Sequence, residues 1–410
     1  MGSTVAGPSH LAGPAGIAGP AGSARPDIIP TASELDGVFC TSSDNCWAVG
    51  DHEISSFAQV NLVQHWTGKK WYTVTVPSPG GTKDGDFSEL YAVRCTSASN
   101  CWSVGYYDKG EVDLTQALHW NGLKWAPSGT PNPGGTNSSG DFSELYDVAC
   151  TSASSCWAGG EYGNFLSDET DNLAVHWNGK KWSKVKTPDP GGTSMGDQNY
   201  LNAIRCASAK DCWAAGAYGD QLIVVGEVLA WNGKKWSVAD APDPNPLLPG
   251  SYDALSGLSC TSATNCWAVG TYGGDGASGY YLNEALHWNG HTWSLVTMPD
   301  PDGMSTGALN ELDSVSCSAA SNCWAVGQFG AVSPTSYASN EALHWKGTKW
   351  VVVNTPDPGG TVDDTSSSTL YGVRCASAKD CWAVGLAEES DHPKRDEILH
   401  WNSTKWLVSP

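Results

Sequence analysis

Short apolar runs alternate with polar turns along most of the chain. In one stretch, the run LYAVRC (residues 90–95) leads through the small polar residues TSASN into CWSVGYY (residues 101–107). Both runs have strand length and are rich in β-branched and aromatic residues, which favours β-strands. The stretch therefore predicts a β-hairpin with a short polar turn.

A second hairpin follows the first. The stretch ALHWNGLKW (residues 117–125) places Asn-Gly between two short apolar and aromatic runs. Asn-Gly is a strong hairpin signal because tight turns need residues that tolerate positive φ. No window has a sustained helical period, and Gly and Pro cluster between the hairpins. One copy of the pattern therefore predicts four strands.

The pair of hairpins recurs seven times. Successive copies begin 54 to 58 residues apart, a period typical of propeller blades. The pattern predicts an all-β fold, a seven-bladed β-propeller with four antiparallel strands per blade. Residues 1–33, rich in Gly, Pro and Ala, predict an N-terminal tail, and residues 34–410 predict the propeller. The predicted blades start near residues 34, 89, 144, 200, 254, 311 and 369.

All fourteen cysteines lie in the first hairpin of a copy, in pairs six positions apart. Such pairs can face each other across a hairpin, and no further Cys or His recurs beside them to complete a metal site. We predict one disulfide per blade. The pairs are Cys40–Cys46, Cys95–Cys101, Cys150–Cys156, Cys206–Cys212, Cys260–Cys266, Cys317–Cys323 and Cys375–Cys381. Because cytosolic thiols are kept reduced, these pairs predict an extracellular or cell-surface protein.

Two repeated motifs resemble those of known propellers. The turn HWNGKKW (residues 176–182) resembles a degenerate Asp-box, the hairpin between the third and fourth strands of blades in bacterial sialidase-like propellers. The Cys-x5-Cys-Trp repeat resembles that of uncharacterised bacterial propeller-like proteins. The resemblance covers about seven residues per blade. It implies a secreted bacterial β-propeller repeat protein and carries over no activity.

The charge is uneven around the predicted blades. The formal net charge is −21, and most lysines fall in the two tight turns of each copy, so most carboxylates belong to the variable loops on the opposite face. An acidic face disfavours nucleic acid and favours cations or basic partners. Discs with one acidic and one basic face could also stack on themselves. No stretch has the length of a membrane span.

Six carboxylates lie next to the Leu of the first predicted strand in four of the copies. They are Glu34, Asp36, Glu89, Glu144, Glu311 and Asp313. If the first strand is innermost, these groups converge at the mouth of the central channel. Oxygen-rich clusters of this kind suit Ca²⁺, which is the one cofactor the sequence predicts; a solvated acidic rim is the alternative.

A second candidate site consists of polar residues that do not recur. Asp51, His52 and Glu53 in the first copy, with Asp391, His392 and Glu397 in the seventh, become neighbours once a ring closes. They are candidates for binding or acid–base chemistry. A sialidase needs a cluster of arginines to bind the carboxylate of its substrate. The chain has only five arginines and no arginine triad on the face of the variable loops, which counts against a sialidase. Paired carboxylates remain an alternative for glycoside hydrolysis.

These features predict a non-enzymatic binding or structural module. We expect its variable acidic face to recognise carbohydrate or a surface protein. Two alternatives are a self-assembling extracellular protein of stacked propellers and a polysaccharide-active hydrolase or lyase. Fold alone does not choose among them, because propellers host many functions.

Overall fold

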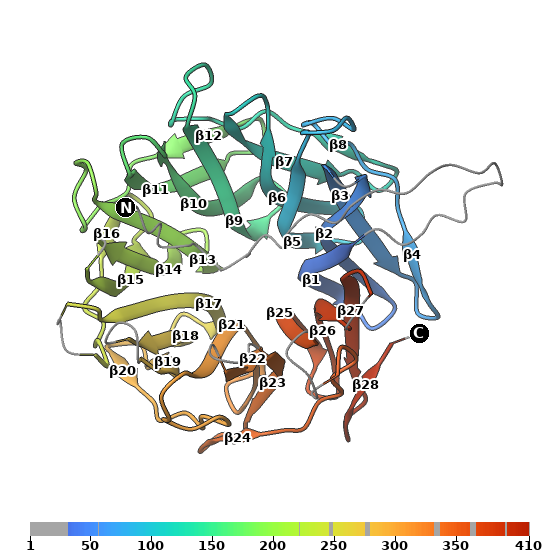
Figure 1. Cartoon of the computed structure of the whole chain (residues 1–410), viewed down its shortest axis with the longest axis vertical. Helices are drawn as coiled ribbons and strands as arrows, with labels where there is room; N and C mark the ends of the chain where they lie inside the picture. The colour runs from blue at the N-terminus through green and yellow to red at the C-terminus, as the bar shows by residue number, and fades with distance from the viewer. Residues whose placement is uncertain are drawn as a thin grey trace.

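The computed structural model describes residues 32–55, 57–220, 222–245, 249–274, 279–331, 337–360, 366–389 and 392–409. Residues 1–31, nearly all of the predicted tail, lie outside this part. The prediction of an all-β fold is confirmed: the described chain forms 28 strands in seven four-strand repeats, here called blades, arranged in a ring (Figure 1). No helix that could cross a membrane occurs among the described residues.

In each blade the strands pair in chain order, from an innermost to an outermost strand. The innermost strands are β1 (Ser33–Ser42), β5 (Ser88–Ser97), β9 (Asp141–Ser152), β13 (Gln198–Ser208), β17 (Tyr252–Ser262), β21 (Ala308–Ala319) and β25 (Ser367–Ser377). The second strands are β2 (Asn45–Ser55), β6 (Asn100–Asp108), β10 (Ser155–Asn164), β14 (Asp211–Gly219), β18 (Asn265–Gly273), β22 (Asn322–Ala331) and β26 (Asp380–Glu388).

The two outer positions are filled by the second hairpin of each copy, whose turn is Asn-Gly or a close equivalent. The third strands are β3 (Ala58–Trp66), β7 (Asp113–Trp120), β11 (Glu169–Trp177), β15 (Val224–Trp231), β19 (Tyr281–Trp288), β23 (Tyr337–Trp345) and β27 (Arg395–Trp401). The outermost strands are β4 (Trp71–Thr73), β8 (Trp125–Pro127), β12 (Trp182–Val185), β16 (Trp236–Val238), β20 (Trp293–Leu295), β24 (Trp350–Val352) and β28 (Trp406–Val408).

Both predicted hairpins have the expected turn chemistry. The seven predicted disulfides all form, and each joins the first two strands of one blade. In the outer hairpin of the third blade, Asn178 Oδ1 accepts hydrogen bonds from the amides of Lys180 and Lys181, and Gly179 has φ of 87°. The side-chain carbonyl therefore holds the tight turn that a left-handed glycine permits.

Tryptophans connect the blades. The Trp that follows the second Cys is buried, and it packs against two Trp of the next blade: Trp47 lies 4.9 Å from Trp120 and 5.3 Å from Trp125 between ring centroids. Trp382 of the seventh blade makes the same contacts with Trp66 and Trp71 of the first, at 4.8 and 5.2 Å. Each aromatic pair contributes about 0.5–1.5 kcal/mol beyond its buried area. The first and last blades are therefore packed like any other neighbours.

Every innermost strand has a β-bulge at the residue after its buried Leu. The seven bulge residues are Asp36, Tyr91, Tyr146, Asn202, Ser256, Asp313 and Tyr371. The second strand has a glycine at the paired position beside the bulge. A Cβ on Gly160 would lie 2.0 Å from the carbonyl oxygen of Glu144, so only glycine allows this close approach.

Candidate functional site at the central channel

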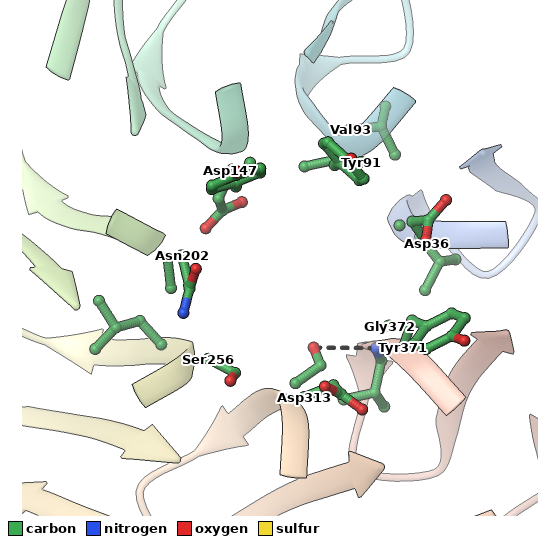
Figure 2. Close-up of a pocket in the computed structure, with 18 of the residues that line it drawn as sticks. Asp36, Tyr91, Val93, Asp147, Asn202, Ser256, Asp313, Tyr371 and Gly372 are labelled. Carbon is green, nitrogen blue, oxygen red and sulfur yellow. Dashed lines mark hydrogen bonds between the residues drawn. The ribbon is translucent and has the colours of Figure 1, made fainter. Parts of the chain in front are cut away.

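The bulge residues surround the axis of the ring. A cavity of about 130 Å³ is lined by residues from all seven innermost strands, including every bulge residue (Figure 2). A bulge places an extra residue opposite one partner and re-aims its side chain. The repeated bulge therefore presents one side chain per blade to the channel, and these residues differ between blades.

The third blade places two carboxylates and a phenol together beside this cavity. Glu144 on β9 lies directly opposite Glu161 on β10, and the Tyr146 hydroxyl donates a 2.5 Å hydrogen bond to Glu161 Oε1. Burial raises the pKa of Glu161 to about 7, and the hydrogen bond from Tyr146 opposes that rise. Burial and the charge of Glu161 raise the pKa of Glu144 well above its usual range. Both carboxyl groups of the pair therefore hold their protons more tightly than an exposed glutamate does.

A second carboxylate group lies between the first two blades. Oxygen atoms of Glu34 on β1, Asp51 on β2 and Glu89 on β5 all lie within 4.8 Å of one another. Asp51 is 3 % exposed and Glu89 is 5 % exposed. Burial, followed by the charges of Glu89 and Glu34, raises the pKa of Asp51 well above its usual range. These three carboxylates are here called the acidic trio.

Arginines occupy the opposite end of the channel, beside the disulfides. The guanidinium carbons of Arg94 and Arg374 lie 4.6 and 4.4 Å from the ring centroid of Phe39, and Arg205 forms an ion pair with Asp147. Burial and the charge of Arg205 lower the pKa of Arg374 to about 10. The channel is therefore acidic toward the variable face and basic toward the disulfide face.

The structure divides the six carboxylates that the sequence predicts as one metal cluster. Only Glu34 and Glu89 belong to the acidic trio, whose third member is Asp51. Asp36 and Asp313 line the cavity at bulge positions. Glu144 pairs with Glu161, and Glu311 accepts a 2.8 Å hydrogen bond from Gln328.

The second predicted group is also divided. Asp51 joins the acidic trio, His52 and Glu53 continue along β2 as half-buried residues, and Asp391 lies outside the described residues. The His392 amide donates to the Glu389 carbonyl. Glu397 is 2 % exposed and accepts a 2.6 Å hydrogen bond from Asn340 of the sixth blade, so it faces away from the first blade.

Sequence reasoning missed three residues of these networks. Glu161 and Tyr146 complete the carboxylate pair, and Asp396 is the residue of the seventh blade that reaches the first. Its Oδ1 and Oδ2 atoms accept hydrogen bonds from Ser33 Oγ, at 2.8 Å, and Gln64 Nε2, at 2.7 Å. The available signal was the repeat itself: no other copy has an acid at the position of Asp396, and only the first copy, with Asp51, has one at the position of Glu161.

No model of a protein family matches the sequence, and no curated protein matches it. Solved structures do share the fold. The chain resembles a GH74 xyloglucanase from Xanthomonas campestris, with 13% identity and a TM-score of 0.55 over 91% of this chain and 55% of that one. It resembles a PL25 ulvan lyase, with 9% identity and a TM-score of 0.54 over 93% of this chain and 97% of that one.

A third similar structure is a puromycin-hydrolysing peptidase of Mycobacterium tuberculosis, with 9% identity and a TM-score of 0.51 over 93% of this chain and 53% of that one. This chain thus spans about half the length of the xyloglucanase and of the peptidase. At these identities the likeness shows a propeller-like fold. The prediction of a non-enzymatic binding or structural module is corrected here, because these similar structures are enzymes, two of which act on polysaccharides.

Proposed function

We propose that the protein is a polysaccharide-active hydrolase that works outside the cell, on a closed seven-bladed β-propeller. The observation that carries this proposal is the placement of Glu144 opposite Glu161 beside the channel, joined by the Tyr146 hydroxyl. The seven disulfides support the extracellular location. The similar polysaccharide-active enzymes support the substrate class.

Glycoside hydrolysis needs one protonated and one ionised carboxyl group on either side of the scissile bond. Glu144 is the general acid, because burial and the charge of Glu161 raise its pKa well above its usual range and so favour its protonated form. Glu161 is the carboxylate that attacks the anomeric carbon or activates water. Tyr146 donates to Glu161, which orients the carboxylate and favours its ionised form.

The surroundings favour a neutral glycan. Asp113 and Glu89 lie close enough to raise the pKa of Glu144 by their charge, and they would repel a uronate or a sulfated sugar. Phe165, which is 55% exposed in the loop between β10 and β11, offers an apolar surface on which a sugar ring can stack. The loop belongs to the same blade as the carboxylate pair.

The test is a screen of the oxidised protein against neutral and acidic polysaccharides, with product analysis. We expect new reducing ends without unsaturated sugars, from a neutral polymer. Glu144→Gln and Glu161→Gln should each lower the rate by about 10²–10⁴-fold. The control is Asp44→Asn, which removes an exposed carboxylate on the opposite face. The proposal fails if both glutamine variants retain wild-type rates, if unsaturated products appear, or if no polymer is cleaved.

A further inference from the structure

The acidic trio brings three carboxyl groups together where two blades meet. Glu34 and Asp51 face each other across the β1–β2 pair, and Glu89 comes from β5 in the second blade. Three carboxylates held this close repel one another strongly unless a cation or protons compensate them.

Asp51 provides a second and independent observation. Its side chain is 3 % exposed, and although Gln59 hydrogen-bonds the carboxylate, the Oδ1 atom has no hydrogen-bond partner among the described residues. An unsatisfied buried carboxylate oxygen is costly, because it has given up water without a replacement. The carboxylate faces Glu34 and Glu89, so the natural replacement is a ligand bound by all three.

The geometry and donor chemistry select the kind of ligand. Oxygen atoms that share one Ca²⁺ at about 2.3–2.6 Å lie at most about twice that distance apart. The 4.8 Å limit within which the three carboxylate oxygens lie satisfies this condition. The donors are all carboxylate oxygens, which suit Ca²⁺ and Mg²⁺ rather than Zn²⁺ or copper. Irregular placement on three strands suits the flexible coordination of Ca²⁺ better than the strict octahedron of Mg²⁺.

We propose that Glu34, Asp51 and Glu89 bind one Ca²⁺ ion at the junction of the first two blades. The ion links the two blades through ligands from both, so it stabilises the folded ring. This proposal does not rest on the proposed hydrolase activity. Ion binding is measured on the protein without substrate, so either proposal can fail while the other stands.

The experiment is a calorimetric titration of the metal-stripped, disulfide-intact protein with Ca²⁺ and, separately, with Mg²⁺, together with thermal unfolding. We expect one Ca²⁺ per chain, a rise in Tm with Ca²⁺ concentration, and weaker binding of Mg²⁺. Luminescence of bound Tb³⁺, excited through Tyr106, gives a second readout, because Tyr106 lies opposite Glu89 in the β5–β6 pair.

Two matched variants complete the test. Asp51→Asn should weaken Ca²⁺ binding at least tenfold, whereas Glu311→Gln should leave it unchanged. Glu311 stands at the repeat position of Glu34 but faces Gln328 in place of an acid. If Asp51→Asn does not fold, Glu34→Gln at a half-buried position replaces it. The proposal is overturned if the wild type shows neither binding heat nor a Tm shift with Ca²⁺. It is also overturned if Asp51→Asn, or Glu34→Gln in its place, binds Ca²⁺ as tightly as the wild type.

Discussion

Glu144 and Glu161 lie directly opposite each other in the β9–β10 pair, and the Tyr146 hydroxyl donates to Glu161 at 2.5 Å. Tyr146 is the bulge residue of β9, two positions after Glu144. The bulge therefore supplies both the register that pairs the carboxylates and the phenol that bonds one of them.

This relationship predicts a specific pH dependence. Glu161 has a pKa of about 7 and acts when ionised, so the rate should rise with pH through about 7. Tyr146→Phe removes a hydrogen bond that favours the ionised form of Glu161, so it should raise the pKa of Glu161. The rise of the rate with pH should then occur about one pH unit higher. The measurement is kcat/KM against pH for both proteins. Superimposable profiles would contradict the role assigned to Tyr146.

A buried carboxyl predicts how stability varies with pH. Burial raises the pKa of Glu397 to about 9, from a usual value of 4.5. Because the folded state holds this proton more tightly, the contribution to stability is complete below about pH 4.5 and is lost as the pH rises toward 9. Glu397→Gln keeps the acceptor for Asn340 and removes this loss.

Urea unfolding at pH 5 and pH 8 measures the effect. The free energy of unfolding of the wild type should fall between these two pH values. In Glu397→Gln this fall should be smaller, by about 1–3 kcal/mol. Parallel curves for the two proteins would show that Glu397 is ionised in the folded state.

The Trp contacts predict how the ring closes. Trp382 and Trp267 have almost the same surroundings: each lies 4.8 and 5.2 Å from two Trp of the next blade, and each packs against a His of its own blade. Each change to Ala should therefore cost about 3–5 kcal/mol. Thermal or urea unfolding compares them. A much smaller loss for Trp382→Ala would mean that the first and seventh blades are not joined in solution.

Each disulfide closes a short loop, and its contribution should be modest. A loop of seven residues corresponds to about 2.4 kcal/mol on the chain-entropy model. Replacing both Cys150 and Cys156 by Ser should lower the free energy of unfolding by about this amount and leave the fold intact. Loss of near-ultraviolet circular dichroism in this variant under native conditions would contradict that expectation.

The repeat made much of the fold predictable, because seven copies of one hairpin pattern reinforce the same strand assignment. The site was less predictable because of the bulges. Counting back from the Cys150–Cys156 pair without a bulge places Glu144 opposite Tyr162, whereas the bulge at Tyr146 places it opposite Glu161. The same shift moves Glu34 from His52 to Asp51. A one-residue change of register exchanges the side chains that meet on each face.

Contacts between distant blades were also outside the reach of sequence patterns. The sequence indicates that the first and seventh copies adjoin, but it does not show that Asp396 turns toward Ser33 while Glu397 turns toward Asn340. Alternation along a strand sends adjacent residues to opposite faces, and packing decides which face meets which blade. Stacking of whole discs stays a prediction that particle size at different concentrations would check.

The most direct test of the proposed hydrolase is chemical rescue of Glu161→Ala by azide. With the carboxylate removed, the small anion can enter the space and attack the anomeric carbon in its place. We predict that the variant is inactive on a substrate of the wild type and that azide restores turnover with a glycosyl azide product. Wild-type activity without azide, or no azide adduct with it, would contradict the role of Glu161 at the centre of the site.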